Sequence, residues 1–179
     1  MELSAPRPGQ IDRARVGVYV FLATEVMFFA GLFSAWVVLA PRRSAEPDLP
    51  LALAMTALLL SSSACLHAAL AARDTSRGRS LALGFAALLL GVLFLVAMAW
   101  EWGALLAAGE HPSTDLWWAC FFVLTGMHGL HVAAGAIWLA CGWFAQARGG
   151  RGRALELAAP YWHFVDLVWL VLLWALYFD

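Results

Sequence analysis

Three groups of ionisable side chains lie inside long apolar stretches of the sequence, where a charge is expensive. Glu25 stands alone in the first of these stretches. His128 and His131 are three residues apart in another stretch, and His163 and Asp166 repeat that spacing in a third. A spacing of three places both members of a pair on one face of a helix. Such groups can hold helices together by hydrogen bonds, handle protons, or bind a metal or haem, and these three interpretations stay open.

The spacing gives the metal interpretation the least support. Two histidines one turn apart suit one metal centre better than two haems stacked across a membrane, and no Glu-x-x-His motif occurs. Three further groups lie near the ends of the predicted helices. Glu101 and Glu156 are expected at the boundaries, and His67 one to two turns inside the end of the second helix.

The composition identifies an integral membrane protein. Of the 179 residues, 63% are hydrophobic and 13% are charged, against about 45–50% and about 25% in ordinary soluble domains. The net charge of −1 provides no electrostatic basis for binding nucleic acid. Cys65, Cys120 and Cys141 have no paired spacing, which argues against a disulfide scaffold, a zinc ribbon or a thiol-redox motif.

Five stretches are long enough to cross a bilayer as helices, which takes about 20 residues each. Three of them carry no charge over 21 to 32 residues, and two are broken only by Glu25 or by Asp166. Their polarity does not alternate as barrel strands require. We predict an all-α polytopic bundle, one transmembrane domain over residues 1–179, in which the first stretch is a retained span and no signal peptide. The predicted helices cover about 16–40, 50–72, 80–103, 116–145 and 157–178.

Arginine placement predicts the orientation of the bundle. With five spans, the N-terminal tail and the loops at 73–79 and 148–156 share one side of the membrane, and that side holds nine arginines against two on the other. The N-terminus is therefore expected in the cytoplasm and the C-terminus in the periplasm. Glu25 would lie about 14 Å deep at 1.5 Å per residue, and His131 near mid-membrane, so that the two can meet.

Three strings of residues, taken in order and spacing, resemble subunit III of the haem–copper terminal oxidases. They are TEVMFFAG at 24–31, TGMHGLHV at 125–132 and YWHFVDLVW at 161–169. The resemblance runs through nearly the whole chain. The family has seven-helix members and a shorter five-helix form, and the five predicted spans are similar to the short form.

The resemblance implies an accessory role in an oxidase complex. The family's buried glutamate corresponds to Glu25 and its partner histidine to His131. Glu101 corresponds to the glutamate of a glutamate–aromatic pair. Four residues occupy the other buried polar motif positions: His128, Glu156, His163 and Asp166. The family leads us to expect no catalytic residue, haem, copper or other metal in this chain, and the five histidines are too few for two haems and a copper.

The family also implies the partners. Subunit III packs against subunit I, which reduces oxygen to water with proton pumping, and shares the complex with subunit II. It binds phospholipid and supports proton uptake and the durability of subunit I during turnover. In this chain Arg73, Arg148 and Trp162 are candidate contacts for a lipid head group, in a bacterial inner membrane. Three features depart from the family pattern. The family's leucine-asparagine-threonine opening of the second helix is replaced by Ala54-Met55-Thr56. Arg148 comes about three positions late, and His67 has no family counterpart.

Other functions are weighed against this one. An accessory subunit of a nitric oxide reductase would share the motifs. An autonomous transporter would predict inverted repeats or broken helices, and neither is found; the interiors of the predicted spans also lack proline. A b-type cytochrome would need haem ligands in this chain. The sequence does not tell whether cytochrome c or quinol supplies the electrons.

Overall fold

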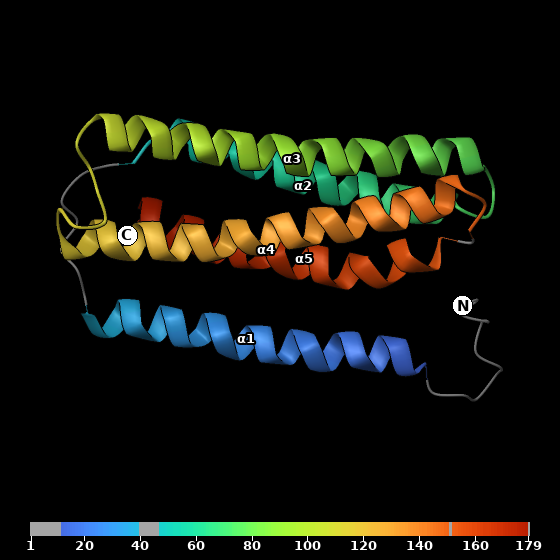
Figure 1. The fold of residues 1–179 in the computed structure, drawn as a ribbon, viewed down its shortest axis with the longest axis horizontal. Coiled ribbons are helices and arrows are strands. Elements are labelled where there is room, and N and C mark those ends of the chain that lie inside the picture. Colours follow the sequence, from blue (N-terminus) through green and yellow to red (C-terminus); the bar gives the residue numbers. More distant parts are fainter. Residues whose placement is uncertain (1–11, 40–46, 151, 179) are drawn as a thin grey trace.

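The protein is an all-helical bundle in a computed structural model that describes residues 12–39, 47–150 and 152–178 (Figure 1). Five helices in the described part of the chain are long and apolar enough to cross a membrane, which confirms the predicted fold class. A π-helical turn, η1, extends the last helix. The elements are α1 Arg13–Leu39, α2 Leu49–Ala72, α3 Arg77–Ala107, α4 Leu116–Ala147, α5 Arg153–Leu173 and η1 Trp174–Phe178.

Short polar side chains fix where three of the helices begin. Asp48 accepts a hydrogen bond from the Leu51 amide at 2.9 Å before α2. Asp115 accepts one from the Trp118 amide at 2.9 Å before α4. Ser76 caps α3 in the same way. Each cap satisfies an amide that has no partner inside its helix.

Two helices run past the predicted bounds. α3 covers 77–107 where 80–103 was predicted, and α5 begins at Arg153 where 157 was predicted. The prediction stopped at charged residues, whereas the backbone hydrogen bonds of a helix continue beyond the hydrocarbon. The statement that the predicted spans lack proline is wrong: Pro160 lies within α5, and also within the predicted span 157–178, and it offers no N–H to the preceding turn.

Helices α4 and α5 form the centre of the bundle, and the other three helices pack on their two faces. α2 and α3 lie side by side on one face of α4 and α5, and α1 lies on the opposite face (Figure 1). Within the described residues, α1 makes its main contacts with α5. Its only buried side chain is Phe29. The first helix is thus attached to the bundle by few apolar contacts.

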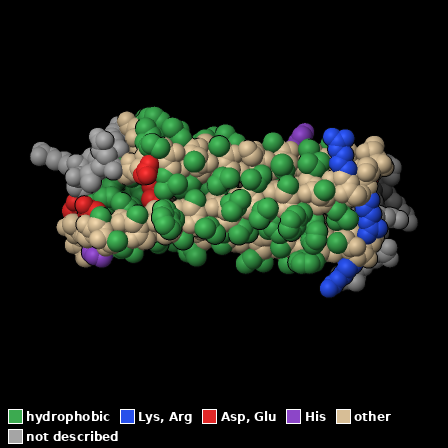
Figure 2. Space-filling view, turned by 90° about the horizontal axis from the view of Figure 1, so that it is seen from above, with side chains coloured by type: hydrophobic (Ala, Val, Ile, Leu, Met, Phe, Trp, Pro, Cys, Tyr) green, Lys and Arg blue, Asp and Glu red, His purple; other side chains and the backbone are tan. Residues whose placement is uncertain are grey.

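Every arginine in the described residues lies at one end of the bundle, which we call the arginine end. The start of α1, the α2–α3 turn and the α4–α5 turn meet there. On the face shown in Figure 2, the visible acidic side chains lie at the other end. Arg7, Arg42, Arg43 and Arg151 lie outside the described residues. The positive-inside rule predicts that the arginine end faces the cytoplasm.

Glycines let large rings and helix backbones approach closely in the centre. A Cβ at Gly91 would lie 2.6 Å from the Trp162 ring, and one at Gly135 would lie 2.9 Å from the same ring. Trp162 is completely buried between them. A Cβ at Gly142 would lie 2.9 Å from the backbone nitrogen of Leu155. Small residues at such contacts are how membrane helices pack without a hydrophobic driving force.

Replacing Gly142 by alanine should push α4 and α5 apart, because its new methyl group meets backbone that cannot rotate away. We expect Gly142→Ala to lower the free energy of unfolding by about 1–3 kcal/mol. Gly31→Ala is the matched control in α1, where nothing lies within 4 Å of the added carbon. Thermal unfolding in mild detergent measures both variants, and equal melting temperatures would contradict the backbone contact.

Candidate functional site

Glu25 of α1 and His131 of α4 meet, as their depths predicted. The Glu25 Oε2 atom lies 2.9 Å from His131 Nε2. His131 Nδ1 lies 2.7 Å from the Met127 carbonyl oxygen. A carbonyl only accepts hydrogen bonds, so Nδ1 must carry a hydrogen. Either a protonated Glu25 donates to Nε2, or an imidazolium donates to the carboxylate, and in both cases one proton lies between the two groups.

Aromatic rings enclose this pair. The Phe29 ring packs edge-on against the His131 ring with centroids 4.9 Å apart, and the Phe28 ring stacks on it at 5.8 Å. The Tyr161 hydroxyl donates to the His131 backbone carbonyl at 3.1 Å. The side chains of His131 and Glu25 are 15% and 17% exposed. The pair is therefore held in a low-dielectric setting and is neutral overall in either protonation form.

His128 does not join this pair, although it lies one turn away on α4. Its ring stacks on Trp169 at 5.3 Å and meets Phe94 edge-on at 5.7 Å. It is completely buried, and neither ring nitrogen has a hydrogen-bond partner among the described residues. A rotation of 60° around a helix separates positions three apart, which directs His131 toward α1 and His128 toward α3 and α5.

His163 and Asp166 of α5 are joined through Ser63 of α2. The His163 Nδ1 atom lies 3.0 Å from the Ser63 hydroxyl, which donates to Asp166 Oδ2. The direct distance from His163 Nδ1 to Asp166 Oδ2 is 3.9 Å. Asp166 is buried and His163 is 47% exposed. Sequence reasoning paired the two correctly but missed Ser63, because helix rotation decides which α2 residue faces them.

Glu101 is buried between helices. It lies near the end of α3, and it is only 3% exposed. The Tyr177 hydroxyl of η1 contacts both of its carboxylate oxygens, at 2.9 and 3.0 Å. This contact joins the far end of α5 to α3. The sequence gives no signal for this bond between Tyr177 and Glu101.

Glu156 is the centre of an ionic cluster at the arginine end. It pairs with Arg15 of α1 and with Arg73 after α2, the latter at 2.9 Å. The hydrogen bond that Arg73 donates to Glu156 is the largest influence on this guanidinium and raises its pKa, against partial burial, with a smaller contribution from Asp74. The cluster ties the ends of three helices together.

The three candidate lipid contacts have different surroundings. Arg73 is engaged by Glu156. Trp162 is buried and donates its indole N–H to Ser62 at 3.1 Å, so a head group on the surface cannot reach it. Arg148 is exposed just after α4. His67 is also exposed, on α2.

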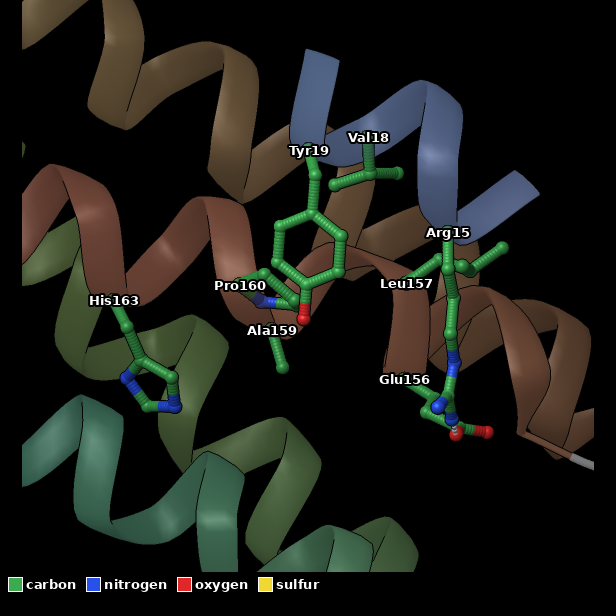
Figure 3. Close-up of a pocket in the computed structure, with 8 residues that line it drawn as sticks. All are labelled: Arg15, Val18, Tyr19, Glu156, Leu157, Ala159, Pro160 and His163. Carbon is green, nitrogen blue, oxygen red and sulfur yellow. Dashed lines mark hydrogen bonds and ion pairs between the residues drawn. The ribbon is translucent and has the colours of Figure 1, made fainter. Parts of the chain in front are cut away.

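Two hollows open on the surface of the bundle. A cavity of about 390 Å³ lies between α1 and α5 and is lined by Arg15, Tyr19, Glu156 and His163 with apolar neighbours (Figure 3). A groove of about 530 Å³ between α3 and α4 is almost entirely apolar. It is lined by Met98, Trp102, Phe122, Val123, Gly126, Met127, Gly129 and Leu130. Over the described residues, no group of three histidine, cysteine or acidic side chains is placed to hold a metal ion.

Asp12 adds a second ionic contact between α1 and α5. Both of its carboxylate oxygens accept from Arg153 Nη2 at 2.7 Å. Partial burial acts to raise the pKa of Asp12, but the Arg153 side chain and the amides of Arg15 and Ala14 outweigh it and lower this pKa below its ordinary value of 3.8. The pair therefore adds stability above the ordinary pKa, which is lost as the pH falls through the lowered value.

Asp12→Asn should keep the helix cap, since asparagine caps as well as aspartate, and lose the charge. The melting temperature of wild type minus that of the variant should be positive at neutral pH and should shrink to zero as the pH falls below the lowered pKa of Asp12. A pH series of melting curves in detergent measures this difference. A difference independent of pH would show that the ion pair adds nothing.

Comparison with known proteins shows which family this sequence belongs to. The family model described as cytochrome c oxidase subunit III matches residues 10–179. Subunit 3 of the cytochrome bo(3) ubiquinol oxidase of Pseudomonas aeruginosa is 32% identical over 173 residues, covering 90% of this chain and 82% of that protein. A probable quinol oxidase subunit 3 of Staphylococcus aureus is 31% identical over 186 residues, covering 97% of this chain and 92% of that protein. The resemblance of the three motif strings is confirmed, and the chain belongs to the cytochrome c oxidase subunit III family.

Proposed function

We propose that this chain is the non-catalytic subunit III of a proton-pumping haem–copper terminal oxidase of the bacterial inner membrane. It packs directly against subunit I, where oxygen is reduced to water, and shares the complex with subunit II. Because the two relatives described above carry quinol oxidase names, we extend the proposal to quinol as the electron donor. The observation that carries the proposal is the Glu25–His131 pair inside a chain of this family.

The redox centres belong to the other subunits in this proposal. Of the histidines predicted to matter, His131 is bonded on both nitrogens and His163 is bonded to Ser63 on one. His128 is enclosed by aromatic rings. Haem and copper would need several histidines directed at one point, so these surroundings favour an accessory role.

Glu25 and His131 modulate proton supply to subunit I. Their shared proton can move between Oε2 and Nε2 without changing the net charge of the pair. Loss of that proton, or gain of a second, leaves a net charge in the hydrocarbon, which is costly. The pair therefore holds one proton firmly and can shift its position in response to a charge on a neighbouring subunit.

Phospholipid binding supports the same role. Arg148 is exposed at the arginine end, where its charge can bind a lipid phosphate. The groove between α3 and α4 lies toward the other end of the bundle, and its apolar lining suits an acyl chain of the opposite leaflet. Gly126 and Gly129 keep its floor open, because a Cβ at Gly126 would lie 3.0 Å from Trp102.

Purification in mild detergent tests the proposed assembly. We expect the tagged chain to bring down a core with haem and copper that oxidises quinol and consumes oxygen, with the optical spectrum of a terminal oxidase. Parallel assays with reduced cytochrome c decide between the two donors. A copper-free core with haem and non-haem iron that reduces nitric oxide would overturn the proposal in favour of the reductase.

Glu25→Gln separates proton modulation from packing. The glutamine amide can donate to His131 Nε2 while Nδ1 keeps its bond to Met127, so the helix contact survives and the shared proton is lost. We expect the variant complex to assemble normally, to turn over more slowly and to inactivate faster during turnover. Oxygen consumption followed to inactivation measures both rates.

Glu25→Leu is the control for packing. It removes the hydrogen bond and leaves the buried His131 nitrogen unpaired, at a cost of about 1–3 kcal/mol. It should weaken retention of the subunit as well as turnover. If Glu25→Gln assembles and retains both the activity and the inactivation kinetics of wild type, the pair has only a structural role.

A further inference from the structure

The cavity between α1 and α5 reaches from the arginine end into the bundle. Arg15 and Glu156 form its outer rim, and the His163 ring lines its inner part (Figure 3). Seven residues of α5 separate Glu156 from His163, about 10 Å at 1.5 Å per residue. A volume of about 390 Å³ has room for on the order of ten water molecules, each of which occupies about 30 Å³ in the liquid.

The lining of this cavity is suited to water. Tyr19 directs its hydroxyl into the space, and Arg15 and Glu156 present charged groups (Figure 3). No described residue bonds to His163 Nε2, whereas Nδ1 is taken by Ser63. A half-exposed imidazole at this depth needs a polar partner, and ordered water in the cavity supplies one.

Beyond His163, a hydrogen-bonded chain ends at a buried carboxyl group. Ser63 Oγ lies 3.0 Å from His163 Nδ1 and donates to Asp166 Oδ2. Asp166 is only 6% exposed. Its Oδ1 atom is buried and has no partner among the described residues. The carboxyl group therefore communicates with the cavity only through Ser63 and His163.

We propose that the cavity admits water from the arginine end and that His163 and Ser63 pass protons between this water and Asp166, a second proton-binding site besides Glu25–His131. This inference deepens the proposed function, and its role in supplying an oxidase rests on that function. The site takes a proton delivered by a hydronium ion.

The transfer conserves protons and moves no electrons. A hydronium ion in the cavity protonates His163 Nε2, and the hydrogen on Nδ1 passes to Ser63 Oγ. The hydroxyl hydrogen of Ser63 passes to Asp166 Oδ2. The net change is one proton moved from water to Asp166, with His163 left in its other tautomer, and the reverse sequence releases the proton.

Few charged or titratable groups face this path. On α1 they are Arg15 and Tyr19, and on α5 Glu156 at the rim. On α2, His67 lies one turn from Ser63 toward the arginine end. Glu156 binds both Arg15 and Arg73, so two guanidinium groups surround one carboxylate at the entrance.

Infrared difference spectroscopy of the purified complex tests the relay. A protonated Asp166 gives a carbonyl stretching band that shifts when H₂O is replaced by D₂O, and Asp166→Asn should abolish that band. His163→Phe keeps a ring of similar size but cannot carry a proton. It should slow the exchange of the band by about a hundredfold, the lower end of what a positioned proton carrier contributes.

Ser63→Ala should slow the exchange in the same way. Ser61→Ala is its matched control, on the exposed side of α2, and should exchange like wild type. Glu25→Gln should leave the Asp166 band and its exchange unchanged, because Glu25 belongs to the Glu25–His131 pair and not to the relay.

The relay is overturned if no band depends on Asp166 over the pH range in which the complex is stable. It is overturned equally if His163→Phe and Ser63→Ala exchange as fast as wild type. In either case, a complex that still assembles and consumes oxygen supports the proposed function. Failure of the relay can therefore be distinguished from failure of the proposed function.

Discussion

The hydrogen bond between Glu25 and His131 is the contact on which the position of the first helix depends. α1 buries a single side chain among its described residues, Phe29, and that ring packs against His131. Lipid tails are as apolar as leucine, so burial alone gives α1 little reason to prefer the bundle to the bilayer. The polar contacts of Glu25 and of the ionic cluster at the arginine end supply that preference. The same contacts carry protonatable groups, so the attachment of α1 and the proton modulation proposed above depend on the same residues.

The other four helices are held together differently. Large rings at Trp162 and Trp169 fill the centre, and each donates its indole N–H to a hydroxyl group on α2. Gly91 and Gly135 leave space for the Trp162 ring. His131 and Asp166 are placed on this packed support, to which α1 contributes one buried side chain, Phe29.

Hydropathy and charge were sufficient to predict the five spans, because the cost of a charge in hydrocarbon acts on each segment separately. The meeting of Glu25 and His131 also followed from depth along the helix axis. Rotation about that axis could not be predicted, since it is set by packing between helices. For this reason Ser63 and Tyr177 were missed as partners, and His128 proved to face a different neighbour from His131. The predicted α3 was too short at both ends, and the predicted α5 began too late. The number of residues without a charge gives the thickness of the hydrocarbon, and these helices extend beyond it.

The distance along the chain between Glu25 and His131 has a consequence for biogenesis. Glu25 and His131 are 106 residues apart, so a ribosome working from the N-terminus delivers the carboxyl group to the bilayer long before its imidazole emerges. Until α4 and α5 have been inserted, nascent α1 must stay near the translocon or a chaperone, or tolerate an acidic group in lipid. Membrane integration of this helix and its docking are therefore separate events, and the second waits until α4 and α5 have been inserted.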